Sequence, residues 1–303
     1  MENVIRPFRK ILIHLGKNMI SHAVIPAAGF GTRFLPATKA QPKEMLPLLD
    51  KPTIQFVVEE AVSSGIRDIL IITGRGKRAI EDHFDRSVEL EEYLKKRGES
   101  ELLERVQRIS ELANIHYVRQ KVQRGLGDAV LCAADHVNGE PFALLLGDTI
   151  VRSKVPCTKQ LIEKYGRLKS PVIAVEEVEK GDVSKYGIVD GTKVDRGMYK
   201  IESLVEKPSP EKAPSNLGII GRYVLTADIF DSIRKTREDA GGEIQLTDAL
   251  NLLCRERDCY ASTFKGERFD IGNQLDYAKA FIRFASENRK IGADLREYME
   301  KIA

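Results

Sequence analysis

Residues 23–33 read "AVIPAAGFGTR", an apolar run that ends in two glycines and an arginine. The first part has the length and composition of a buried strand, which the glycines then end. Gly29 and Gly31 can adopt positive φ angles and let backbone N–H groups approach a phosphate closely. The stretch therefore indicates a strand followed by an anion-binding loop, and the ordinary alternative is a solvated glycine turn.

This loop does not match the two common nucleotide-binding motifs. Phe34 stands where GxGxxG requires its third glycine, and no GxxxxGK[ST] string occurs, which argues against a P-loop switch. What remains is GxGTR, which carries Arg33 and is followed ten residues later by Lys43. The arginine fork and the lysine ammonium could clamp a triphosphate and offset charge on a departing pyrophosphate. We expect Lys39 and Lys51 to be surface charges.

Apolar runs and helical stretches alternate beyond this loop. The runs lie at 23–27, 68–73, 115–120 and 142–148, with helical stretches at 53–65, 78–113 and 128–137. This order indicates a parallel sheet covered on both faces, where ligands bind beyond the carboxyl ends of the strands. Shorter strands follow at 171–178, 186–191, 200–208 and 217–225, then a helical end from about 275 to 302. The sequence thus predicts an α/β fold with a mixed, mostly parallel central sheet and C-terminal helices.

The charged segment 87–114 is predicted to form two helices broken at Gly98. An apolar stripe recurs at helical spacing at Leu90, Leu94, Leu102, Leu103, Val106 and Ile109. We expect an insertion that packs through this stripe, and a partner-binding surface is the alternative.

Composition excludes several classes of protein. A net charge of +3 over 303 residues is too small for a typical nucleic-acid binder, and no apolar run is long enough to span a membrane. The four cysteines form no CxxC pair, which predicts free thiols in a cytoplasmic protein. Residues 1–20 are a basic extension of unknown role, too broken in hydrophobicity for a secretory signal. The five histidines, His14, His22, His83, His116 and His136, share no metal-binding spacing, so structural or surface roles are expected.

Two aspartates are candidates for holding a metal ion. Asp148 ends the apolar run "FALLLGD" and could bind Mg²⁺ at the ligand edge of the sheet, although a turn or N-cap aspartate is the commoner case. Asp270 in "ERFDIGN" offers a second carboxylate before a flexible glycine. Two aspartates beside a phosphate loop fit metal-assisted phosphate chemistry.

Two further strand ends carry polar groups. The Gln120 amide can donate and accept hydrogen bonds, so with Gly125 it could match a pyrimidine edge; a helix-starting turn explains the spacing equally well. In "LVEKP", Glu206 could hold sugar hydroxyls and Lys207 a phosphate, provided that the chain bends, as Pro208 favours. An exposed surface pair is the alternative for this dipeptide.

Several ordered strings together resemble a known family. They include "FLPATKAQPKEMLP", "HFDRS", "RQKVQRGLGDAVLCA", "LLGDTIV", "VEKP" and "RFDIGN", and the likeness runs from about Ser21 to Ala285. The chain resembles the bacterial-type UTP–glucose-1-phosphate uridylyltransferases of the sugar nucleotidyltransferase family. The resemblance implies a Rossmann-like fold, Mg²⁺, and conversion of UTP and glucose 1-phosphate to UDP-glucose and pyrophosphate. It also suggests a homo-oligomer, either a dimer or a tetramer.

The resemblance assigns roles to residues of this chain by motif. It implies that the uridine is contacted by Ala28, Gly29, Gln120 and Gly125, and the phosphates by Arg33, Lys43 and Lys207. It implies that the glucose is contacted by Glu206, Gly187 and Gly218, and that Mg²⁺ is bound by Asp148 and Asp270. One domain over 21–303 would comprise a nucleotide half at about 21–150, a sugar half at about 151–274 and C-terminal helices at 275–303. A thymidylyltransferase that uses dTTP, or a regulatory binding protein that has lost the chemistry, are the alternatives.

Overall fold

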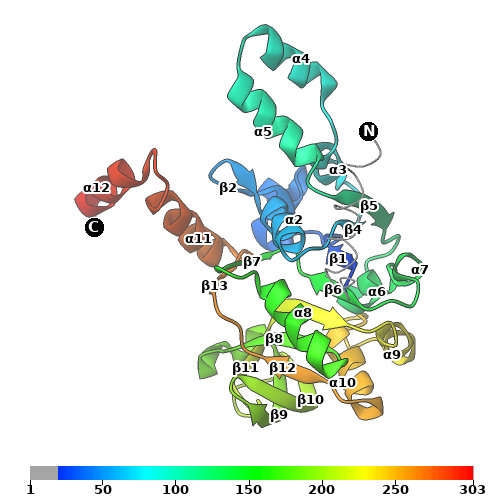
Figure 1. The fold of residues 1–303 in the computed structure, drawn as a ribbon. Coiled ribbons are helices and arrows are strands. Elements are labelled where there is room, and N and C mark those ends of the chain that lie inside the picture. Colours follow the sequence, from blue (N-terminus) through cyan, green and yellow to red (C-terminus); the bar gives the residue numbers. More distant parts are fainter. Residues whose placement is uncertain (1–19, 303) are drawn as a thin grey trace, which may run out of the picture.

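The computed structural model describes residues 20–302, so the predicted extension at 1–20 lies almost entirely outside the described residues. Its centre is a nine-stranded mixed sheet in the order β5-β4-β1-β6-β11-β8-β12-β10-β9 (Figure 1). Four parallel neighbours come from the first half of the chain: β1 (His22–Pro26), β4 (Asp68–Thr73), β5 (Asn114–Arg119) and β6 (Phe142–Leu145). These strands lie where the apolar runs predicted them. The expected mixed sheet is confirmed, but it is not mostly parallel, because four of its strand pairings are parallel and five are antiparallel.

The second half of the chain completes the sheet with β8 (Val172–Glu177), β9 (Gly187–Asp195), β10 (Met198–Glu206), β11 (Leu217–Leu225) and β12 (Tyr260–Ser262). β11 runs antiparallel to β6, β8 and β9, and β10 runs antiparallel to β9 and β12. The expectation of shorter strands here was wrong for β9, β10 and β11, which have nine residues each. Polar residues such as Thr192 of β9 and Glu202 of β10 interrupt the apolar pattern of those two strands, because part of the β9–β10 hairpin faces solvent, whereas β11 is buried throughout.

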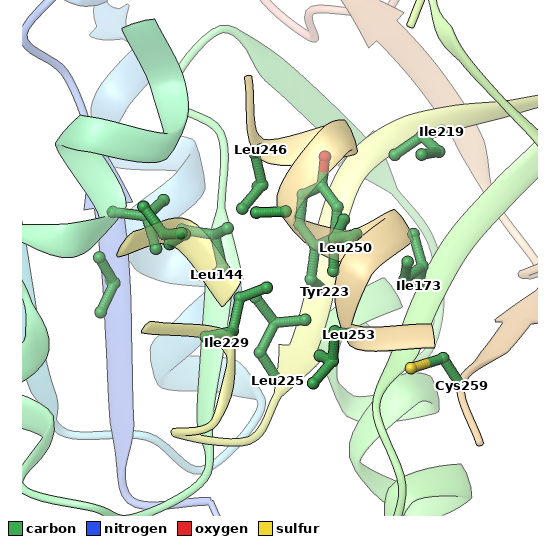
Figure 2. Packing of buried hydrophobic residues seen from close by; sticks show 14 of the residues in the cluster. Leu144, Ile173, Ile219, Tyr223, Leu225, Ile229, Leu246, Leu250, Leu253 and Cys259 are labelled. Atoms are coloured by element: carbon green, nitrogen blue, oxygen red, sulfur yellow. The ribbon is translucent and has the colours of Figure 1, made fainter. Parts of the chain in front are cut away.

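Helices cover both faces of the sheet. One face packs against α2 (Thr53–Ser63), α3 (Arg78–Phe84) and α8 (Cys157–Leu168), and the other against α6 (Gly125–Leu131), α7 (Ala134–Val137), α9 (Ile229–Lys235) and α10 (Leu246–Glu256). Successive residues of a strand point to opposite faces, so Ile69 and Ile71 enter one core while Leu70 and Ile72 enter the other. Figure 2 shows the second core, where Tyr223 lies among leucines of α10.

The charged insertion forms a helical hairpin that projects from the body of the molecule (Figure 1). α4 (Val88–Lys96) and α5 (Ser100–Ser110) are separated at Gly98, whose φ of 72° confirms the predicted break. The predicted packing through the apolar stripe is correct only in part. Leu94 is buried, whereas Leu90 and Leu102 are 42% and 47% exposed.

The C-terminal part forms a smaller unit beside the main sheet. β7 (Thr149–Arg152) pairs with β13 (Glu267–Asp270), and α11 (Gln274–Ser286) and α12 (Gly292–Ile302) extend outward from it (Figure 1). A short hairpin, β2 (Pro47–Leu48) and β3 (Lys51–Pro52), adds Leu48 to the small core beneath α11. All four cysteines are free, as predicted. None of the helices in the described part of the chain is long and apolar enough to cross a membrane.

Candidate active site

The loop after β1 folds as a series of short turns rather than as a helix or strand. Three 3-10 turns follow one another: η1 (Thr32–Phe34), η2 (Ala37–Lys39) and η3 (Lys43–Met45). Gly31 has a φ of 68°, and its carbonyl accepts a 2.7 Å hydrogen bond from Thr38 Oγ1. Phe34 is buried edge-on against Tyr277 of α11, with 5.8 Å between ring centroids. These contacts hold the exposed Arg33 and the half-buried Lys43 on one folded loop.

Lys43 points at the turn that joins β6 to β7. Its Nζ lies 2.7 Å from Asp148 Oδ2, and the two side chains are 22% and 29% exposed. The Lys43 ammonium holds the pKa of Asp148 below its usual range, although burial opposes this shift. Burial alone would lower the pKa of Lys43, but the charges of Asp148 and Glu44 outweigh it, so the pKa is raised. Both groups are therefore charged over the whole neutral pH range.

Asp270 and Arg33 converge on the same place from two other segments. Asp270 ends β13 opposite Thr149, and its Oδ1 accepts a 2.7 Å hydrogen bond from Gly272 N. Arg33 NH1 donates to the Gly272 carbonyl at 3.3 Å. A Cβ atom on Gly272 would lie 2.9 Å from Asp270 Oδ1, 3.6 Å from Arg33 NH1 and 3.8 Å from Asp148 Oδ2. Two carboxylates and a guanidinium therefore surround this glycine, and the two carboxylates offer the oxygen ligands that Mg²⁺ prefers.

Glu206 and Lys207 face the site from the end of β10. Glu206 accepts a 2.6 Å hydrogen bond from Thr247 Oγ1, and Lys207 Nζ lies 3.0 Å from Glu206 Oε1. The side chains of adjacent residues meet because Lys207 has a φ of 42°, which turns the chain sharply. The bend that had been attributed to Pro208 is therefore made at Lys207 itself.

Of the two glycines predicted for the glucose site, Gly187 lies beside this carboxylate and Gly218 does not. Gly187 pairs with Glu206 across the β9–β10 ladder, and a Cβ atom there would lie 2.9 Å from Thr247 Oγ1 and 3.2 Å from Glu206 Oε2. Gly218 instead faces away, with Val178 Cγ1 only 2.9 Å from where its Cβ would lie. An alanine at position 218 would therefore require Val178 to move.

The remaining candidates lie at the carboxyl ends of β1 and β5. Ala28 and Gly29 follow β1, and the Ala28 carbonyl accepts a 2.8 Å hydrogen bond from Gln123 Nε2. Gln120 is buried after β5 and donates through Nε2 to Asp128 Oδ2 at 2.7 Å and to the Gly125 carbonyl at 3.3 Å. Gly125 has a φ of 91°, and the Ile244 carbonyl would lie 2.8 Å from a Cβ there. The glycine therefore also lets the segment before α10 approach closely.

A cavity of about 290 Å³ joins several of these groups. Its lining includes six of the predicted site residues: Arg33, Asp148, Gly187, Glu206, Lys207 and Asp270. Lys43 reaches the same place through its ion pair with Asp148. Ala28, Gly29, Gln120, Gly125 and Gly218 lie outside this lining. The structure thus brings together both aspartates and the three cations. The predicted uridine contacts lie outside the cavity, at the carboxyl ends of β1 and β5.

Comparisons with known proteins agree with this arrangement. The Nucleotidyl transferase family profile matches residues 22–287. UTP–glucose-1-phosphate uridylyltransferase 2 of Staphylococcus saprophyticus is 53% identical over 283 residues, which cover 93% of this chain and 98% of that protein. This chain belongs to the bacterial UTP–glucose-1-phosphate uridylyltransferase family.

Solved structures of uridylyltransferases have the same fold. A UDP-glucose pyrophosphorylase complexed with UDP-glucose superposes with a TM-score of 0.81 at 42% identity, covering 89% of this chain and all of that one. The UTP-bound UGPase from Acinetobacter baumannii gives a TM-score of 0.87 at 38% identity, covering 94% of this chain and 100% of that chain. The family membership predicted from the motifs is confirmed.

This uridylyltransferase chain also contains supporting residues that the motif reading missed. Arg222 is fully buried in β11 and donates to the carbonyls of Leu146 and Thr149, which flank the Asp148 turn. Its charge is balanced by Glu60 of α2, whose Oε2 lies 3.0 Å from Arg222 Nε. A lone arginine within the apolar string "LGIIGRYVL" was the signal that could have revealed this position.

A second buried ion pair supports Lys43. Lys77, in the loop after β4, lies with its Nζ 2.8 Å from Glu44 Oε2, and both side chains are less than a tenth exposed. Glu44 is the residue after Lys43 within η3. The pair therefore fixes the turn that carries Lys43 to the end of a central strand.

Proposed function

We propose that this chain transfers the uridylyl group of UTP to α-D-glucose 1-phosphate and releases UDP-glucose and pyrophosphate. The observation that carries the proposal is the convergence of Asp148, Asp270, Arg33 and Lys207 on one cavity, with Lys43 bonded to Asp148. An oxygen of the sugar phosphate attacks the α-phosphorus of UTP. The new P–O bond forms as the bond to the leaving oxygen breaks, and pyrophosphate departs with that electron pair.

No side chain acts as a covalent nucleophile in this scheme. The chain contributes by positioning two polyanions and by neutralising the charge that develops between them. Arg33 and Lys43 lie on the glycine-rich loop and act on the triphosphate, whereas Lys207 acts on the sugar phosphate. The short Lys43–Asp148 distance supports this assignment, because it places a lysine beside the proposed metal ligand.

The uridine is assigned to the strand ends of the first half. The recorded hydrogen bonds of Gln120 use its amide nitrogen, so its carbonyl oxygen is the atom that can accept from the N3–H of uracil. Gly125 holds its carbonyl against the same amide, and Ala28 and Gly29 offer backbone groups with little side-chain bulk. A Cβ on Gly29 would meet nothing within 4 Å, which leaves room for a base or ribose.

The glucose is assigned to Glu206 and the glycines around it. The Glu206 carboxylate is oriented by Thr247 and can accept hydrogen bonds from sugar hydroxyls. Gly187 leaves space beside this carboxylate, and Gly218 lets β11 approach Val178 and Tyr186, of which Tyr186 lines the cavity.

The two carboxylates suit Mg²⁺, with Asp148 as the main ligand and Asp270 as the second. One oxygen of each lies within 4 Å of one point, the position that a Cβ on Gly272 would take, and hard oxygen ligands are those that Mg²⁺ takes. When bound, the ion would neutralise charge on the phosphate oxygens. Lys43 then orients Asp148, and Arg33 orients the Gly272 carbonyl.

We also propose a single domain and a homo-oligomeric assembly for this chain. One domain over 21–303 divides into a nucleotide half at about 21–150 and a sugar half at about 151–274, with C-terminal helices at 275–303. A Rossmann-like arrangement is supported by the parallel strands β5, β4, β1 and β6. Exposed apolar residues on α11 and α12 support a homo-oligomer, a dimer or a tetramer, with Leu275, Tyr298 and Ile302 each more than half exposed.

Pyrophosphate release tests the proposed reaction directly. UTP, dTTP, CTP and ATP are each supplied with glucose 1-phosphate and with galactose 1-phosphate, in the presence of Mg²⁺. We expect UTP with glucose 1-phosphate to give the highest kcat/KM. Faster turnover with dTTP would identify a thymidylyltransferase instead, and binding of UTP without any pyrophosphate release would identify a regulatory protein that has lost the chemistry.

A further inference from the structure

Three histidines meet near the amino ends of the parallel strands, at the end of the sheet opposite the candidate active site. His22 begins β1, Asp68 begins β4, His116 lies near the start of β5, and His136 lies in α7. His136 Nε2 is 2.8 Å from Asp68 Oδ1, His22 Nδ1 is 3.5 Å from the same oxygen, and His116 Nε2 is 4.0 Å from it. Three of the four histidines within residues 20–302 therefore surround one carboxylate oxygen.

The hydrogen bonding of His22 is incomplete in a way that points to a cation. Its Nε2 lies 3.3 Å from Glu140 Oε2, a carboxylate that accepts hydrogen bonds. With Nε2 facing Glu140, Nδ1 is the ring nitrogen left to bind a ligand. This atom is buried and has no hydrogen-bond partner, yet it faces the Asp68 carboxylate at 3.5 Å. A cation held between Nδ1 and the Asp68 carboxylate would satisfy both groups.

A carboxylate holds the His22 ring in the way that carboxylates hold the rings of metal-binding histidines. Metal-binding histidines usually donate their other ring N–H to a carboxylate, which fixes the ring and its tautomer. Glu140 provides that carboxylate for His22, and Glu140 Oε2 itself accepts a 2.9 Å hydrogen bond from Ser21 Oγ. The chain Ser21–Glu140–His22 therefore aims Nδ1 at Asp68 and His136.

We propose that His22 Nδ1, His136 Nε2 and the Asp68 carboxylate form a Zn²⁺ site. The three ligand atoms all lie within 4.8 Å of one another. Zn²⁺ binds nitrogen and carboxylate oxygen at about 2.0–2.2 Å in tetrahedral geometry, which separates ligand atoms by about 3.4 Å. The distances from Asp68 Oδ1 to the two rings, 2.8 and 3.5 Å, bracket this value. His116 or a water completes the fourth position.

This site differs in chemistry and place from the proposed Mg²⁺ site. Imidazole nitrogens favour Zn²⁺ and its neighbours in the first transition row, whereas Mg²⁺ takes oxygen ligands. His22 and Asp68 are at the amino ends of β1 and β4, while the phosphate loop follows the carboxyl end of β1. The ion would therefore be a structural metal that cross-links β1, β4 and α7, and it would not contact the substrates.

Zinc binding by the full chain tests the site directly. The protein is stripped with a chelator, dialysed, and titrated with ZnSO₄ by isothermal titration calorimetry, while CoCl₂ serves as a spectroscopic probe. We expect one equivalent of Zn²⁺, a visible d–d spectrum for Co²⁺ typical of tetrahedral nitrogen and oxygen ligands, and a higher Tm with Zn²⁺, since a ligand that binds only the folded state stabilises it. Excess MgCl₂ should not displace the Zn²⁺. Failure of the stripped protein to bind Zn²⁺ would overturn the proposal.

Variants separate this site from other zinc ligands on the chain. His22→Gln should abolish the equivalent, and Glu140→Gln should weaken Zn²⁺ binding by about 10- to 100-fold, as is usual when such an outer carboxylate is lost. His83→Gln is the matched control, because His83 bonds to Gln55 instead. Because Glu140 does not touch Asp68 or His136 in the recorded contacts, its variant keeps the ligand set and should fold. Unchanged binding in both His22→Gln and Glu140→Gln, or an equal loss in His83→Gln, would contradict the assignment.

Discussion

Lys43 and Asp148, 105 residues apart in the chain, form an ion pair with 2.7 Å between Nζ and Oδ2. The pair joins the glycine-rich loop after β1 to the turn after β6. It therefore connects the residues proposed for the triphosphate with those proposed for the metal.

Asp148→Ala and Lys207→Ala should each lower kcat by orders of magnitude while the fold is retained. Removing one group that stabilises charge in a transition state usually lowers kcat by about 10²- to 10³-fold. Steady-state pyrophosphate release measures the effect, and circular dichroism checks the fold. Lys212→Ala, an exposed lysine on the loop after β10, is the control and should turn over normally. Near-normal rates in both site variants would exclude the proposed mechanism.

The Lys43–Asp148 pair also predicts how stability depends on pH. Because the pKa of Asp148 is lowered in the folded protein, its contribution is complete above about pH 3.9, the ordinary aspartate pKa, and is lost as pH falls further. Because the pKa of Lys43 is raised, its contribution is complete below about pH 10.4 and is lost at still higher pH. The difference in Tm between wild type and Asp148→Asn should therefore be constant from about pH 3.9 through neutral pH. A difference that shrinks near neutral pH would contradict this prediction.

The sequence predicted the strands and the places of the site residues because both follow from local patterns. Continuous apolar runs such as 68–73 are typical of strands buried on both faces, and Asp148 follows such a run, so the ligand edge could be located. The turn at Lys207 could not be predicted, because a lysine rarely adopts a positive φ, and the neighbouring proline offered a simpler cause of a bend.

Residues whose roles depend on partners far away in the chain could not be recognised from the sequence. Arg222 could be noticed as a charge within an apolar strand, but its partner Glu60 is 162 residues away and no local pattern joins them. The histidine cluster was missed for the same reason. His22 and His116 belong to different strands, and only the order of strands in the sheet brings their amino ends to one edge.

Arg222→Met should separate stability from activity. It leaves Glu60 charged and buried, and breaking a buried pair in this way costs about 3–5 kcal/mol of unfolding free energy. Arg222→Met/Glu60→Gln should regain part of this stability, because no unpaired charge remains and the amide oxygen can still accept from Thr158. Urea unfolding measures both.

The double variant should nevertheless have a low kcat, because the carbonyls of Leu146 and Thr149 have lost the hydrogen-bond donor that holds the Asp148 turn. Kinetics at a temperature where both variants are folded makes the comparison. If the double variant regains full kcat together with its stability, Arg222 supports only the fold and not the site.

Glu206→Gln should weaken the enzyme toward the sugar phosphate alone. A hydrogen bond to a charged group contributes about 1.5–3 kcal/mol, so KM for glucose 1-phosphate should rise by about 10- to 150-fold. KM for UTP should not change, because Glu206 lies at the end of β10, away from the strand ends assigned to uridine. Initial rates with each substrate varied in turn separate the two constants, and an equal rise in both would argue against a glucose-specific role.

Gly187→Ala should have a similar selective effect through crowding. The new methyl group would lie 2.9 Å from Thr247 Oγ1 and 3.2 Å from Glu206 Oε2, so the Thr247–Glu206 hydrogen bond must shift to admit it. We expect a higher KM for glucose 1-phosphate, because Thr247 and Glu206 line the cavity, and a lower Tm, because Ile219 Cδ1, 3.2 Å from the new methyl group, belongs to the core. Gly181→Ala is the matched control, since a Cβ there meets nothing within 4 Å. Equal kinetics in the two alanine variants would show that the space beside Glu206 is not where the sugar binds.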